Sequence, residues 1–206
     1  MFIFAGTHYN NMGRSVADMD VLSKGEITEL IRSEKVPRNR ALIAMLYLTG
    51  ARISEALLVK RKDLWKESIG DDGFIVIRMR TLKKYDILDK HMNIDGTKTF
   101  DTQLRTEHRN IPIRISRDRD MLNHLIGWAK SKRQDELLFP IGRRWAWKIM
   151  SKHGFFNHYW RHCRNTHLVT QRNFTDQDLV KFHGWADSKP ASIYTHLRWK
   201  DLARKM

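Results

Sequence analysis

The chain has 206 residues and a mass of 24.5 kDa, enough for one sizeable core and a single domain. Its 38 Lys and Arg residues outnumber 23 Asp and Glu, and the formal net charge of +15 favours a polyanionic partner, nucleic acid ahead of an anionic membrane. A single cysteine, Cys163, excludes an intramolecular disulfide and a cysteine zinc site, and no segment is apolar enough to be a membrane span or a signal peptide. We therefore expect a soluble, untargeted protein of the cytoplasm.

The N-terminal segment predicts an arm followed by a helix. Residues 1–20 are polar and contain Asn and Gly, which indicates a loosely ordered lead-in. Ser23-Lys-Gly-Glu26 then has the spacing of a capping box, and apolar residues follow it with helical period. We expect this helix to end near Glu34, before Pro37.

A helix, glycine turn, helix unit comes next. Residues 39–48 carry an apolar stripe typical of a helix with one face toward the core, and Gly50 ends it. Arg52 follows at the bend, and residues 53–59 resume the helical pattern. We expect residues 63–65 to close this unit before a polar turn.

Two segments rich in β-branched residues predict a small antiparallel sheet. Residues 74–79 follow Gly73 as a strand, and residues 110–115 are its expected partner. The intervening stretch, about residues 81–109, is much longer and more charged than an ordinary hairpin connection. We expect this hairpin insertion to be either disordered or used to contact DNA.

The remainder of the chain predicts helices only. Thr175 provides an N-cap and Pro190 suits a first helical turn, while Cys163 is expected to fill a small buried space rather than act as a nucleophile. The sequence thus predicts a mainly helical α+β domain with a small antiparallel sheet. The expected C-terminal helices cover residues 118–128, 143–153, 157–168, 176–182 and 190–198.

Five dispersed side chains suit the transfer of a phosphoryl group to a phenol. His158 and Arg161 are three residues apart on one predicted helix, so both can project from one face and bind one phosphate. Alone, this pair is more typical of a basic helix surface, and a lone Tyr194 is more often a core aromatic. The presence of Arg52, Trp185 and Tyr194 together favours a site in which a tyrosine attacks a phosphodiester.

The motifs around these residues resemble those of the tyrosine recombinases, the phage integrase family, over about residues 20 to 200. The family's Thr-Gly-x-Arg-x-Ser-Glu motif stands here as Thr49-Gly-Ala-Arg52-Ile-Ser-Glu55, which is a specific match. His-x-x-Arg-His stands as His158-Tyr-Trp-Arg161-His162, and Tyr-Thr-His as Tyr194-Thr-His196. The resemblance implies the helical catalytic domain of these enzymes, with Tyr194 as nucleophile and Arg52, Arg161 and His158 around the phosphate.

Two further positions follow from the same resemblance. The family places a hydrogen-bond donor after Leu-Gly, nine residues ahead of the tyrosine, and His183-Gly-Trp185 puts an indole there, so Trp185 is preferred and His183 is the alternate. The family's hairpin lysine, which protonates the leaving 5′-oxygen, corresponds to Lys83, with Lys84 as the alternate.

Two neighbouring side chains have supporting roles under this interpretation. Glu55 is expected to orient the guanidinium of Arg52, although an exposed helix pair remains open, and His162 is expected either to support the site or to fill a helix interface.

The implied function is a site-specific DNA recombinase, an integrase or excisionase of a virus, plasmid or mobile element, acting through a 3′-phosphotyrosine intermediate. It needs no metal, nucleotide or other cofactor, and its partners are double-stranded DNA and a tetramer of its own copies on DNA. The alternatives are a type IB topoisomerase or telomere resolvase, and a non-catalytic DNA-binding regulator with the same fold. Family members commonly carry an N-terminal DNA-clamping domain, whereas here we expect an arm at 1–20 and the catalytic domain alone at 21–206.

Overall fold

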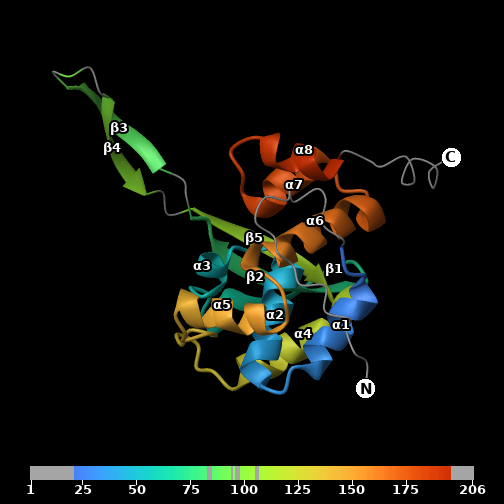
Figure 1. Cartoon of the computed structure of the whole chain (residues 1–206). Coiled ribbons are helices and arrows are strands. Elements are labelled where there is room, and N and C mark those ends of the chain that lie inside the picture. The colour runs from blue at the N-terminus through green and yellow to red at the C-terminus, as the bar shows by residue number, and fades with distance from the viewer. Residues whose placement is uncertain (1–20, 83–84, 94, 96–97, 105–106, 196–206) are drawn as a thin grey trace.

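A three-stranded antiparallel sheet lies against helices that precede and follow it in the chain (Figure 1). The computed structural model describes residues 21–195 except 83–84, 94, 96–97 and 105–106. The helices are α1 (Lys24–Ser33), α2 (Pro37–Thr49), α3 (Ile53–Ala56), the 3-10 helix η2 (Arg61–Asp63), α4 (Ile115–Lys130), α5 (Arg143–Lys152), α6 (Asn157–Arg172), α7 (Asp176–His183) and α8 (Lys189–Thr195). The strands are β1 (Leu64–Ile69), β2 (Asp72–Arg80), β3 (Tyr85–Met92), β4 (Lys98–Leu104) and β5 (His108–Arg114).

Helix α2 is the centre of the core. Asn39 and every residue of 41–49 are buried. The sequence predicted that only one face of this helix would be buried, and this was wrong because the helix is buried on several faces. The helix packs against α1, α4 and α6, and it is therefore covered on more than one side (Figure 1). Gly50 caps its C-terminus in the left-handed conformation, with φ 56°, as the sequence predicted.

The sheet has the strand order β1-β2-β5, and the expected pairing of residues 74–79 with 110–115 is confirmed. One prediction was wrong, because residues 64–69 form the edge strand β1 instead of a turn. Only Leu64 of this strand is buried. The apolar residues of β1, Leu64, Trp65 and Ile69, do not alternate with its polar ones, and backbone hydrogen bonds to β2 stabilise this edge strand.

The long insertion between β2 and β5 contains a second, two-stranded sheet. Strands β3 and β4 pair in antiparallel fashion with a register shift between Ile87 and Asp89. Figure 1 shows this hairpin projecting away from the helices and the main sheet. In the described residues the insertion therefore forms a hairpin of regular strands instead of the expected disorder, and the expected contact with DNA stays a prediction.

A buried carboxylate holds α6 against two earlier helices. Asp118 lies at a kink in α4, where its φ is −122°, and its side chain has no exposed surface. It pairs with Arg172 of α6 at 2.8 Å and with Lys24 of α1 at 2.9 Å, and Arg164 of α6 lies 3.7 Å away. Burial alone would raise the pKa of Asp118, but the three cations hold it below its usual value. This network fixes the helix that carries Arg161.

The last three helices form a smaller apolar cluster beside the main core. Its buried members come from α6, α7 and α8, and Trp185 and Tyr194 pack against them. Thr175 caps α7 through a capping box with Asp178, as predicted, and Pro190 lies in the first turn of α8. Cys163 is fully buried, and burial raises the pKa of its thiol to about 11, in keeping with the expected filling role.

Candidate active site

The turn after α2 brings Arg52 to the site through a close backbone approach. A Cβ atom added at Gly50 would lie 2.7 Å from Cε1 of His183, so any larger residue would displace this ring, and the positive φ of Gly50 also favours glycine. The ring of His183 therefore packs directly on the turn that precedes Arg52. Arg52 then forms the N-cap of α3, and its backbone N–H donates to Glu55 at 3.0 Å.

Glu55 is a fully buried carboxylate shared by two arginines. Its Oε1 accepts from Nη1 of Arg52 at 3.1 Å, and its Oε2 accepts from Nη2 of Arg109 at 2.9 Å. Burial alone would raise the pKa of Glu55, but Arg109 and the other hydrogen bonds and charges hold it below its usual value. This agrees with the expected orienting role for Glu55, and the exposed helix pair is excluded because the side chain is not exposed.

Arg161 is a buried cation with unused hydrogen-bonding capacity. It is 5% exposed, and neither of its terminal nitrogens has a hydrogen-bond partner among the described residues. Burial lowers its pKa to about 10, with a further contribution from Arg52, so the guanidinium is still charged at pH 7. Three arginines with one carboxylate leave a net charge of +2 at this point, which is the electrostatic setting for an anion.

Trp185 covers this arginine, and His183 lies next to the indole. The guanidinium carbon of Arg161 is 5.4 Å from the centre of the Trp185 ring, within the range of a cation-π contact. His183 stacks on Trp185 at 4.6 Å, is fully buried and bonds through Nε2 to Asn165. Burial, followed by the charge of Arg161, holds the pKa of His183 well below its usual value. Trp185 is half-buried, whereas His183 is fully buried, and the choice of Trp185 as the donor stays a prediction.

Tyr194 of α8 lies beside α6 within the same chain. Its ring centre is 5.6 Å from that of His162, which is itself buried. Burial raises the pKa of Tyr194, while Asn165 and Arg161 lower it by a smaller amount. The positive charge of Arg161 therefore lowers the pKa of Tyr194 by less than burial raises it. The role of Tyr194 as the nucleophile stays a prediction, and such a role would require a base.

The remaining sequence-predicted residues are His158, His162, Lys83 and Lys84. His158 is exposed on the first turn of α6, one turn before Arg161, and its role at the site stays a prediction. His162 borders Tyr194, in agreement with either supporting role. Lys83 and Lys84 lie outside the described residues, so the assignment of the general acid stays a prediction.

Sequence reasoning missed Arg109, Thr81 and Asn165. Along β5 buried and exposed residues alternate, and Arg109 occupies the buried face two positions before Ile111. That alternation was the available signal, because a strand extended back by two residues places this arginine inward. Asn165 follows Arg161 by four residues on α6, a spacing that puts both on one helix face.

The exposed face of α5 combines cations with aromatic rings. Trp145 and Trp147 are each 52% exposed, and the amine of Lys148 lies 5.7 Å over the Trp145 ring. Arg143 and Arg144 are also exposed, and the helix contains no acidic residue. Helix α5 packs against α3, at whose start the candidate site begins (Figure 1). Such a face fits the phosphates and the apolar edges of a nucleic acid.

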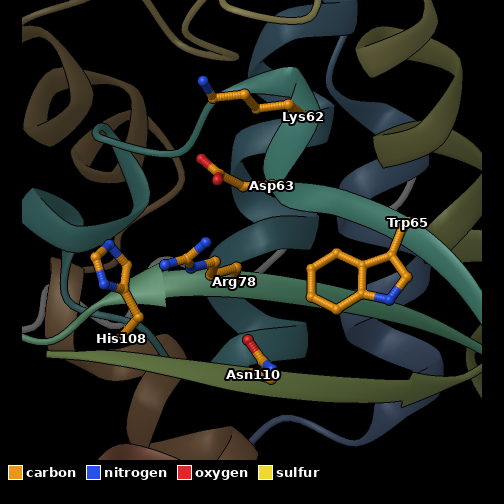
Figure 2. A pocket seen from close by; sticks show the side chains of 6 residues that line it. All are labelled: Lys62, Asp63, Trp65, Arg78, His108 and Asn110. Carbon is orange, nitrogen blue, oxygen red and sulfur yellow. The ribbon is translucent and has the colours of Figure 1, made fainter.

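A separate cavity lies on the solvent side of the sheet. It has a volume of about 510 Å³, and Figure 2 shows the side chains around it. Of the sequence-predicted catalytic residues that the structure describes, none lines this cavity. Its lining residues are Lys62, Asp63, Trp65, Arg78, His108 and Asn110.

The part of the chain that the structure describes has no group of three or more His, Cys, Asp or Glu side chains arranged to bind a metal ion. In the same part of the chain, no helix combines the length and apolar character required to cross a bilayer.

The fold is similar to that of several solved recombinases. A XerH site-specific recombinase bound to its difH substrate aligns with a TM-score of 0.54 and 21% identity, over 89% of this chain and 52% of that one. XerA recombinase aligns with a TM-score of 0.56 and 18% identity, over 91% and 64%. The Tn1549 transposon integrase, in complex with a circular intermediate DNA, aligns with a TM-score of 0.55 and 15% identity, over 92% and 66%.

No protein-family model matches the sequence, and no curated protein matches it significantly. The chain spans between about half and two thirds of the length of these solved structures. The similarity covers 89% to 92% of this chain. The chain therefore has the fold of the tyrosine recombinase catalytic domain, as its motifs predicted.

Proposed function

We propose that the chain is the catalytic part of a site-specific DNA recombinase that cuts and rejoins DNA through a covalent link to Tyr194. The observation that carries the proposal is the buried guanidinium of Arg161, which has no partner for its terminal nitrogens among the described residues and whose charge acts on Tyr194. A buried, unsatisfied cation is costly for a fold unless a ligand completes it. A phosphodiester supplies the missing charge and acceptors.

In the proposed step, the phenol oxygen of Tyr194 attacks the phosphorus, and the bond from phosphorus to the DNA 5′-oxygen breaks. Arg52 and Arg161 each direct N–H donors to the non-bridging oxygens, and the indole N–H of Trp185 adds one donor. His158 is the candidate acceptor for the phenol proton, and Lys83 supplies a proton to the leaving oxygen. The 3′-phosphotyrosyl link keeps the bond energy, so a DNA 5′-hydroxyl can reverse the step without a nucleotide.

Several finer assignments belong to the same proposal. The partner is double-stranded DNA, contacted by the exposed face of α5 and by the projecting hairpin of β3 and β4. Exchange between two DNA sites would use four copies of the chain. The recombination reaction would take place on DNA in the cytoplasm. An origin in a virus, plasmid or other mobile element is supported by the similarity to a transposon integrase.

The test uses nicked suicide duplexes made from DNA that flanks the gene. Wild-type protein is expected to form an adduct with the 3′-phosphate that survives SDS, and Tyr194→Phe is expected to form none while it binds the same DNA. Binding without an adduct by the wild type would contradict the proposal and favour a regulator. An adduct followed by relaxation of supercoils, with no exchange between two sites, would favour a topoisomerase.

A further inference from the structure

Arg109 is a buried arginine at the start of β5 whose contacts lead to three parts of the candidate site. It is 7% exposed and lies between His108 and Asn110, which line the cavity on the opposite face of the sheet (Figure 2). Its Nη2 pairs with Glu55 at 2.9 Å, and its Nη1 donates to Oγ1 of Thr81 at 3.2 Å. The charge of Arg109 is thus directed inward, toward α3.

The first connection runs through Glu55 to Arg52. Each carboxylate oxygen of Glu55 accepts from the guanidinium of a different arginine, and Oε2 also accepts from the backbone N–H of Arg52. The side chain of Arg52 therefore makes one contact with Glu55 instead of a two-nitrogen fork. The remaining donors of Arg52 stay available for a phosphate. Without Arg109, Oε2 of this buried carboxylate would lose its guanidinium partner and could accept a second nitrogen of the Arg52 side chain, and this would withdraw Arg52 from the phosphate.

The second connection joins the base of the hairpin to the turn before Trp185. A Cβ added at Gly184 would lie 3.0 Å from Oγ1 of Thr81 and 3.5 Å from Cδ of Arg109. The backbone N–H of Thr81 donates to the carbonyl of Glu107 at 2.8 Å, which closes the hairpin at its root. The aliphatic part of Arg109 thus lies against the Gly184 turn, and its guanidinium bonds to Thr81 and Glu55. Arg109 therefore connects these three residues.

We infer that Arg109 is a positioning residue that orients Arg52 through Glu55 and fixes the Gly184 turn and the hairpin root against it. The inference rests on the proposed function, since it assigns Arg109 a task in the same phosphate site. It places the root of a DNA-contacting hairpin in direct contact with the ion pair that orients a catalytic arginine. A purely stabilising ion pair would affect unfolding and leave the orientation of Arg52 unchanged.

The experiment compares Arg109→Met, Arg109→Lys and Glu55→Gln with the double variant that combines Arg109→Met and Glu55→Gln. Arg78→Met serves as the control, because Arg78 is an exposed arginine on the outer face of the same sheet. The double variant also guards against misfolding, since it removes the buried carboxylate that the single change leaves without Arg109. The readouts are thermal unfolding, DNA affinity, the single-turnover rate of adduct formation, and binding of inorganic phosphate in a thermal-shift titration.

We expect Arg109→Met to slow adduct formation by about 30-fold or more while DNA affinity changes by less than about threefold. Arg109→Lys should recover part of the rate, because an ammonium keeps the charge but cannot span both Glu55 and Thr81. In the double variant the losses should not multiply, since both changes act through the same contact. A wild-type rate in Arg109→Met, or fully multiplying losses, would overturn the inference.

Phosphate binding separates this inference from the proposed function. If wild-type protein forms no adduct, the recombinase proposal fails, yet the orientation of Arg52 can still be measured with inorganic phosphate. Arg109→Met should then weaken phosphate binding by about fivefold or more, and Arg78→Met should not. Equal phosphate binding by Arg109→Met and wild-type protein would overturn the role of Arg109 whatever the outcome with DNA.

Discussion

The guanidinium of Arg161 lies beneath the indole of Trp185, 5.4 Å from the ring centre, and both of its terminal nitrogens lack hydrogen-bond partners among the described residues. An apolar ring thus shields a cation that burial has already removed from water. The contact stabilises the charge from one side only, through the face of the ring. The unpaired nitrogens remain for a ligand, and the strength of that ligand's binding should reflect the cost of burying the charge.

The first prediction concerns the opposite effects of one substitution on stability and on activity. Arg161→Met removes a buried charge without hydrogen-bond partners, so we expect the melting temperature to stay level or rise by about 2–4 °C. Adduct formation should fall by at least about 100-fold, because a phosphate donor is lost. Arg164→Met is the matched comparison on the same helix and should lower the melting temperature, since Arg164 faces the buried carboxylate of Asp118. A large loss of stability in Arg161→Met would contradict our account of its environment.

The second prediction separates the indole ring of Trp185 from its N–H group. Trp185→Phe keeps an aromatic face over Arg161 but has no donor, and we expect adduct formation to slow by about 100-fold. Trp185→His restores a donor, and its rate should be within about tenfold of the wild-type rate. Both rates are measured in single turnover at saturating protein. A wild-type rate in Trp185→Phe would show that the indole acts only by packing.

The third prediction follows from the raised pKa of Tyr194, which burial causes. A phenol that stays protonated at neutral pH is a poor nucleophile, and its deprotonated fraction grows as the pH rises toward its pKa. The rate of adduct formation should therefore increase between pH 6 and 9 if no base assists, or level off above about pH 6.5 if an imidazole does. A rate that falls with rising pH across this range would rule out deprotonation of Tyr194 before or during attack.

The variant His158→Ala decides between these two pH profiles. If His158 accepts the proton, its removal should lower the rate near neutral pH and convert a level profile into one that keeps rising. If the wild-type profile already rises throughout and the variant follows it, His158 is not the base.

The fourth prediction tests the exposed face of α5 as a DNA contact. Lys148→Gln should reduce the slope of log affinity against log salt by about 0.9, since one phosphate contact is lost. Trp147→Ala should weaken binding and leave that slope unchanged, because an aromatic ring releases no counterions. Lys130→Gln, at the exposed end of α4, is the control. Equal salt slopes in all three variants would place the DNA on another face of the molecule.

The fifth prediction compares two glycines with nearly the same backbone conformation. Gly50 and Gly70 have φ values of 56° and 57°, but an added Cβ meets His183 at 2.7 Å in the first and nothing within 4 Å in the second. Gly70→Ala should cost about 1 kcal/mol of unfolding free energy, and Gly50→Ala about 3 kcal/mol or more. Urea unfolding measures both. Similar losses in the two variants would mean that His183 moves aside at little cost.

Local patterns in the sequence predicted most of the helices and the central strands. The capping boxes of α1 and α7 act within one helical turn, and the alternation in β2 and β5 reports burial directly. Strand β1 was missed because its polar residues carry no such pattern, and pairing with β2 is what makes it a strand. The strands β3 and β4 were likewise not predicted, because their charged residues interrupt any apolar alternation.

In the candidate site, too, local sequence predicted some residues and only tertiary packing revealed others. Motif spacing was enough to single out Arg52, Arg161, Trp185 and Tyr194, because each lies in a local sequence setting that resembles a known family. Arg109, the second arginine that Glu55 binds beside Arg52, could not be recognised in this way. Arg109 acquires its contact only when β5 pairs with β2 and turns that one charged residue toward α3. The sequence thus determined which side chains are the candidates for the site. Tertiary packing decided which charges are buried, paired or left open, because burial and pairing depend on neighbours distant along the chain.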